Sequence, residues 1–222
     1  MRDLIRQHFA AASFGEVIEE HVSPTARFRL EVRTCPTGPN RWNYTRGEVT
    51  RLTDNRLLSV VERNYSAFWH CWVLHPDGHE YLLCGEDYQG YSVINLTAEQ
   101  EHVYLSEAGI KGSGFCWAEI LPSPDRLALA VSGCIWGGPF DAMIFDFSQP
   151  HELPLPEIAR LNDIYALERW KDDEVLVCSR ESYLRPEDDR ELAPDEVEIE
   201  EERDPSGIRT IRRNLELKRL RG

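Results

Sequence analysis

The sequence predicts an all-β protein, a small stack of antiparallel sheets with a short N-terminal helix. Three observations support this prediction: a unit recurs at a spacing of 48 residues, each copy places a turn sequence before a short strand, and those strands are continuously apolar. Strands that are apolar on both faces are typical of sheets buried between other layers. A chain of 222 residues with 41% apolar residues can bury an ordinary core. We therefore expect one domain over residues 1–222.

The composition excludes several classes of protein. The net charge is −14, and phosphate affinity comes from Lys and Arg, so a general basic surface for nucleic acid is not expected. No apolar run approaches the ~20 residues that a membrane-spanning helix needs, so no membrane association is expected. No dinucleotide, phosphate-loop or zinc-protease motif is present, and we expect no cofactor.

Residues 1–22 are predicted to be a helical segment that docks on the sheets. Five side chains are expected to share one helical face there, namely Leu4, Ile5, His8, Phe9 and Ala12. Charged residues interrupt this stretch before a signal-peptide apolar region could form, which favours a cytoplasmic protein. The six cysteines include no C-x-x-C pair. Buried free thiols are therefore favoured over a disulfide framework or a zinc site.

Four positions of the repeat recur at one offset. The two best copies align Trp69 with Trp117, Pro76 with Pro124, Asp77 with Asp125 and Gly85 with Gly133. The Pro-Asp pair is expected to close a hairpin, because proline presets one turn torsion and aspartate bonds its own backbone two residues on. Strands are then expected at 81–84 and 91–96, and at 127–131 and 142–147.

A third, weaker copy covers strands at 164–170 and 174–179. In this copy Tyr165 takes the place of Trp117, and Asp173 takes the place of Asp125. Upstream, residues 27–35, 41–52 and 56–64 also have the composition of strands, without the tryptophan and Pro-Asp marks.

The repeat unit resembles a known kind of blade. Residues 121–132, which read Leu-Pro-Ser-Pro-Asp-Arg-Leu-Ala-Leu-Ala-Val-Ser, together with Ile144-Phe145-Asp146, resemble one blade of a TolB-like or WD-repeat β-propeller. His75-Pro76-Asp77-Gly78 through Asn95 resembles another. Propeller blades take ~40–50 residues, so the resemblance implies about four blades. The implied fold is a small closed propeller, or an open one capped by the N-terminal segment.

In such a blade, the loops between the second and third strands emerge on one face. Loops 85–90 and 133–139 carry a large aromatic residue near glycines, and the third loop is an acidic insertion at residues 183–206. We expect this face to bind a protein, although Trp136 could instead fold back over the central channel. The candidate binding residues are Glu86, Asp87, Tyr88, Trp136, Glu198, Glu200 and Glu202.

The acidic insertion has two possible structures. Residues 187–204 hold 11 acids and two arginines, which is compatible with a solvated segment. Alternatively, the turn sequence Asp204-Pro205-Ser206-Gly207 closes a hairpin. Glu202 would then face Arg209, and Glu198 would face Arg213, so that the basic C-terminal strand pairs with the acidic one.

No catalytic residue is assigned from the sequence. Glu119 lies in an apolar strand and is the best candidate for a perturbed pKa. The side chains of His70, His75 and His79 are expected to point in different directions, so no metal site is predicted.

Two functions remain. The first is a non-catalytic module that binds a basic protein, for example a toxin in an immunity-type pair. The second is a small hydrolase or lyase with Glu86, Asp87 and Glu119 at a channel mouth.

Overall fold

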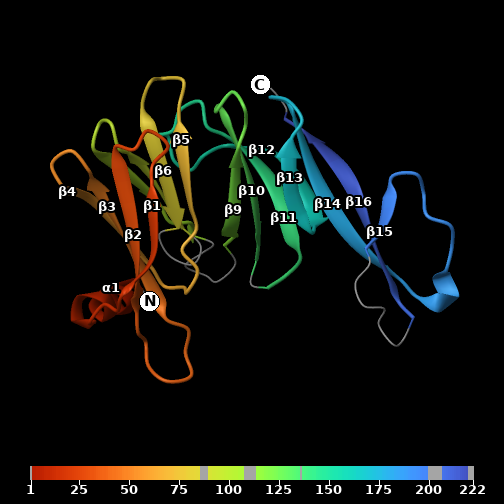
Figure 1. Ribbon diagram of the computed structural model, residues 1–222, viewed down its shortest axis with the longest axis horizontal. Coiled ribbons are helices and arrows are strands. Elements are labelled where there is room, and N and C mark those ends of the chain that lie inside the picture. Colours follow the sequence, from red (N-terminus) through yellow and green to blue (C-terminus); the bar gives the residue numbers. More distant parts are fainter. Residues whose placement is uncertain (1, 86–89, 108–113, 136, 200–206, 220–222) are drawn as a thin grey trace. The chain divides into compact units, whose positions relative to one another are not determined.

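The part of the chain that the structure describes folds into four antiparallel sheets of four strands each. The computed structural model describes residues 2–85, 90–107, 114–135, 137–199 and 207–219 (Figure 1). Within these ranges the α-helix is α1 (Arg2–Ala11), and a 3-10 turn covers Pro186–Asp188. The predicted all-β class with a short N-terminal helix is therefore confirmed. The predicted helical segment at 1–22 is shorter in the structure, because Val17–Val22 forms strand β1.

The first two sheets follow the chain in simple order. The first sheet contains β1 (Val17–Val22), β2 (Phe28–Cys35), β3 (Tyr44–Arg51) and β4 (Arg56–Arg63). The second sheet contains β5 (His70–Leu74), β6 (Glu80–Gly85), β7 (Tyr91–Asn95) and β8 (Gln100–Tyr104). Each sheet therefore leaves its first strand, β1 or β5, at one edge.

The third sheet follows the same plan, and the fourth departs from it. The third contains β9 (Cys116–Pro122), β10 (Ala128–Cys134), β11 (Phe140–Asp146) and β12 (Glu157–Ile164). The strands of the fourth lie in the order β13 (Ala166–Trp170), β14 (Val175–Leu184), β16 (Arg209–Lys218) and β15 (Glu196–Ile199). Strand β15 comes from the acidic insertion and adds to the outer edge of β16.

The Pro-Asp turn works as the sequence predicted in the second and third sheets. The Oδ1 atom of Asp77 accepts the N–H of His79 at 2.8 Å, and that of Asp125 accepts the N–H of Leu127 at 3.0 Å. Each aspartate therefore bonds the backbone two residues on, and the next strand begins one residue later. In the second of these turns Arg126 takes a positive φ of 61°.

The fourth sheet uses a different aspartate from the one predicted. Asp172, not Asp173, accepts the N–H groups of Glu174 and Val175, both at 2.8 Å. The prediction was wrong by one residue because the acceptor has to lie three residues before the strand, and β14 begins at Val175. An alignment at a fixed offset misses this one-residue shift.

The first sheet contains the same turn, although the sequence analysis did not identify it. Ser23 Oγ accepts the N–H of Phe28 at 3.3 Å, as Ser123 Oγ accepts that of Ala128 at 3.0 Å. Pro24 follows Ser23, as Pro124 follows Ser123, and Thr25 takes the place of aspartate. The repeated Ser-Pro pair was the available signal.

The chain divides into two compact units, each with its own core. The first comprises residues 1–117 and 148–155, and the second comprises 118–147 and 156–222. The core of the first unit joins β2, β3 and β4 to β6 and β7 through residues such as Leu30, Val49 and Leu82. The core of the second joins sheets three and four through residues such as Ile144 and Leu176.

Two more features bear on the predictions. All six cysteines are free and buried, as the sequence predicted. Among the described residues, no helix has both the length and the apolar character that crossing a membrane requires.

Three aromatic rings stack in the first unit. The ring of Trp117 lies between those of Tyr91 and Trp69, with centroids 4.3 Å and 5.7 Å away and interplanar angles near parallel, at 22° and 23°. The two tryptophans of the repeat therefore contact each other. Gly85 leaves room for Trp69 and Arg63 against β6, because a Cβ there would lie 2.8 Å from Trp69 Nε1 and 1.5 Å from Arg63 Nη1.

Candidate functional site

The fourth sheet extends as an arm beyond its packed part. Strand β14 pairs with β16 over ten residues, from Val175↔Lys218 to Leu184↔Arg209, whereas β13 pairs with β14 only as far as Ser179. Beyond Ser179 the arm consists of β14, β16 and the added strand β15 (Figure 1). We use the word arm for residues 180–199 and 207–213. Within it Ile211 is the buried apolar residue, so packing contributes little to its stability.

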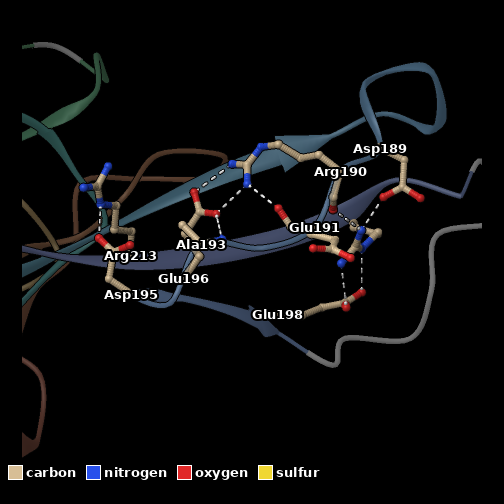
Figure 2. A network of polar contacts seen from close by, with 9 residues as sticks. Asp189, Arg190, Glu191, Ala193, Asp195, Glu196, Glu198 and Arg213 are labelled. Atoms are coloured by element: carbon tan, nitrogen blue, oxygen red, sulfur yellow. Dashed lines mark hydrogen bonds and ion pairs between the residues drawn. The ribbon is translucent and has the colours of Figure 1, made fainter.

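Ion pairs between arginines and carboxylates hold the arm together (Figure 2). Arg190 donates to both carboxylate oxygens of Glu196, at 2.7 and 2.8 Å. Glu196 also accepts the N–H of Ala193 at 2.9 Å. These two contacts, the Arg190 bond first, lower the pKa of Glu196 to about 2. The Glu196 side chain is therefore ionised at neutral pH.

A second arginine binds two carboxylates at once. Arg209 donates to Glu198 through Nε and Nη2, both at 3.2 Å, and to Asp189 through Nη1. Arg213 donates to Asp195 at 2.6 Å (Figure 2). The arm is therefore built from alternating charges that reach across β15 and β16, as the hairpin alternative predicted.

The register of that hairpin differs from the prediction. Glu198 was expected to face Arg213, but Glu196 is the partner of Arg213 and Glu198 is that of Ile211. The Glu198 side chain instead reaches Arg209. Turn sequences alone do not fix how many residues a loop contains, and the register follows from that number. The other expected pair, Glu202 with Arg209, includes a residue outside the described ranges.

One face of the arm exposes an aromatic and an aliphatic side chain. Tyr183 is 69% exposed and Val197 is 66% exposed. The register places Tyr183 opposite Thr210 and Val197 opposite Arg212, and positions two residues apart along β16 share a face. The Arg212 guanidinium lies 4.5 Å from the ring centroid of Tyr165 and donates to Glu181 at 2.5 Å. We call Tyr183 and Val197 of the arm, together with Tyr165 just before β13, the exposed apolar face.

Most of the predicted binding residues cannot be placed. Glu86, Asp87, Tyr88, Trp136, Glu200 and Glu202 lie outside the described residues. Glu198 lies on β15 and takes part in the Arg209 pair. Exposed residues missed by sequence reasoning are Tyr183 and Val197. Val197 lies between Glu196 and Glu198, and this alternation was an available signal, whereas Tyr183 follows Ser182 and carries no such signal.

Glu119 has the perturbed pKa that the sequence suggested. Desolvation raises the pKa of its carboxyl, and the charge of Glu168 raises it further, against a hydrogen bond from Ser132 at 3.5 Å. The other two carboxylates of the predicted channel-mouth site, Glu86 and Asp87, lie outside the described residues. Glu119 is therefore a perturbed group without a described catalytic partner.

Two of the three nearby histidines, His75 and His79, pack on the ring of Tyr81, whereas His70 lies elsewhere. His75 Nδ1 lies 3.1 Å from Asp77 Oδ1, and His79 Nδ1 lies 2.7 Å from Asn95 Nδ2. His70 instead packs against His21, with ring centroids 4.1 Å apart. Burial lowers the pKa of His70 to about 4, with further lowering from His21, so its imidazole is neutral at pH 7. His70 therefore lies apart from the His75 and His79 rings, which share Tyr81 as a neighbour.

Comparison with known proteins leaves the family open. No protein-family model matches the chain. The chain is 38% identical over 131 residues to uncharacterized protein R762 of Acanthamoeba polyphaga mimivirus, a match that covers 59% of the chain. The chain spans about half of that relative, 51% of its length. Among solved structures it matches the β-propeller domain of Cps50 (Swd1) from Myceliophteria thermophila. This match has a TM-score of 0.44 and 11% identity, over 96% of this chain and 54% of that one.

Proposed function

We propose that this chain is a non-catalytic protein-binding module, and that the arm of the fourth sheet receives a basic partner protein. The observation that carries this proposal is a charge surplus. Residues 181–213 hold 12 acids and six arginines, so the segment stays strongly negative after its arginines are counted. A concentrated negative surface speeds the encounter with a cationic partner.

The construction of the arm supports the same proposal. Its strands extend past the core of the second unit and bury little apolar surface, so the fold does not need their length. The β14–β16 ladder nevertheless orders the arm, and the Arg190–Glu196 and Arg209–Glu198 pairs add to it. A surface that is already ordered loses less conformational entropy on binding.

The composition of the exposed apolar face is also that of an interface. Tyrosine and arginine are enriched at the centres of protein interfaces, and Tyr183 and Tyr165 lie with Arg212 on this face. Acidic side chains around exposed aromatic residues combine attraction at a distance with apolar burial on contact. A basic toxin, neutralised in an immunity-type pair, is one partner with that chemistry.

The experiment compares two matched pairs of charge reversals. Asp188 and Glu191 are exposed and make no ion pair among the described residues, so Asp188→Lys with Glu191→Lys changes the charge without breaking the network. The control reverses two exposed acids of the first unit, Glu16→Lys with Glu152→Lys. Each purified protein is used as bait in lysate of the source organism, and captured proteins are quantified by mass spectrometry in low and high salt.

We expect the unaltered chain and the control to capture a basic protein in low salt, and the arm variant to lose it. Association should also weaken as salt screens the charges. Equal capture by the arm variant and the control, or a captured partner that is not basic, would overturn the proposal. Deleting the insertion is a poorer test, because it also removes β15 from the edge of β16.

A further inference from the structure

Two histidines and one glutamate converge between the first two sheets. Glu19 and His21 lie on β1, and His70 lies on β5. One ligand atom from each residue falls in a group whose members all lie within 4.8 Å of one another. Glu19 Oε2 and His21 Nε2 are 3.0 Å apart. All three residues belong to the first unit, so the grouping is part of one compact body.

The local structure explains the convergence. Glu19 and His21 are two residues apart on a strand, so their side chains point to the same side. The register of β1 with β2 shifts between Val17 and Glu19, and such bulges re-aim the side chains next to them. Both β1 and β5 are edge strands of their sheets, and the side chains of His21 and Glu19 are 36% and 41% exposed.

The donor set suits a transition metal. Imidazole nitrogens and a carboxylate are the ligands that zinc uses when a water or substrate occupies its fourth position. In tetrahedral zinc sites the donor atoms are roughly 3.3 Å apart, given bonds of about 2.0–2.1 Å. Glu19 Oε2 and His21 Nε2 already lie near that spacing at 3.0 Å, and the other separations, at most 4.8 Å, have to close by up to about 1.5 Å. Among the described residues, neither ring nitrogen of His70 makes a hydrogen bond, so both are available to bind a metal.

We propose that Glu19, His21 and His70 bind one divalent ion of the zinc class. Trp72 lies on the same strand as His70, and their rings are 6.3 Å apart in an edge arrangement. An apolar wall of this kind restricts water on one side of a metal and holds the imidazole in place. The alternative is a surface ion pair between His21 and Glu19 with His70 stacked on it, and this alternative binds no metal stoichiometrically.

The test measures zinc binding to the full chain with any affinity tag removed. Zn²⁺ chloride is titrated by calorimetry with the thiols kept reduced, and Co²⁺ is added separately so that visible absorption reports nitrogen and oxygen ligands. The variants are His21→Gln and Glu19→Gln, which lie on an edge strand and leave the core intact. The matched control is His102→Gln, whose ring lies 6.4 Å from His151 in a second histidine pair.

We expect one Zn²⁺ per chain. We also expect each ligand variant to bind Zn²⁺ at least ~10–100-fold more weakly, because losing even an outer partner of a metal ligand weakens binding by that factor. The control should bind as tightly as the unaltered chain. Binding well below one equivalent, or ligand variants that bind as tightly as the control, would overturn the proposal.

Discussion

Replacing Trp117 by alanine is expected to destabilise the first unit strongly. Trp117 is 6% exposed and stacks between Tyr91 and Trp69. Truncation of a buried tryptophan costs about 3–5 kcal/mol, because the apolar surface is lost and a cavity remains. Each stacked ring pair adds about 0.5–1.5 kcal/mol beyond area burial. We therefore expect the loss of unfolding free energy to lie in the upper half of the range of about 3–5 kcal/mol.

Trp42→Ala is the matched control for this prediction. Trp42 is 57% exposed, and its indole N–H donates to Asn64 O at 3.3 Å. Losing that one hydrogen bond should cost about 0.5–1.5 kcal/mol. Urea unfolding followed by far-ultraviolet circular dichroism measures both variants without depending on tryptophan emission. A loss below about 1 kcal/mol for Trp117→Ala would refute the reasoning, since a core aromatic cannot cost so little.

Three further predictions concern the packing, the arm and the thiols. Gly85→Ala should destabilise the first unit, because the new Cβ collides with Arg63 and Trp69; unchanged urea unfolding would contradict this. Acidification should release β15. The Arg190 bond and the Ala193 N–H lower the pKa of Glu196 from 4.5 to about 2, so its stabilisation is present above pH 4.5 and is lost as pH falls toward 2. The protection of β15 amides, corrected for the intrinsic pH dependence of hydrogen exchange, should therefore fall across that window, and less so in Glu196→Gln; flat protection would contradict it. A thiol reagent should find six thiols after unfolding and few before, since all six are buried, and a stoichiometric disulfide in a non-reducing mass measurement would overturn this.

The strands could be predicted from the sequence because their signals are local. The Pro-Asp turns at Asp77 and Asp125 fix where a strand begins, and apolar runs such as 127–131 mark the buried strands that follow. Outer strands such as β8 and β12 were missed because they are half-exposed and carry charged residues. Their pairing depends on the neighbouring strand more than on their own composition.

The sites depended on contacts that the sequence does not display. Glu19 and His70 are 51 positions apart, and only the packing of β1 near β5 brings them together. The fourth sheet shows the same limit, because β15 pairs with β16 in a register set by the length of the intervening loop. Charge complementarity predicted that these two strands pair, but it could not choose between registers that differ by one or two residues.

The carboxylates of the arm divide into two groups with different roles. Glu196, Glu198 and Asp195 are bound by arginines, so substituting them should loosen β15 before it changes any encounter with a partner. Asp188 and Glu191 are exposed and contribute net charge without holding the arm. If the proposed partner is attracted by charge, reversing this second group should slow association while hydrogen exchange of β15 stays unchanged. If the partner instead requires only the ordered arm, substituting the arginine-bound carboxylates should be the change that slows association. Association rate and hydrogen exchange of β15 would then change together.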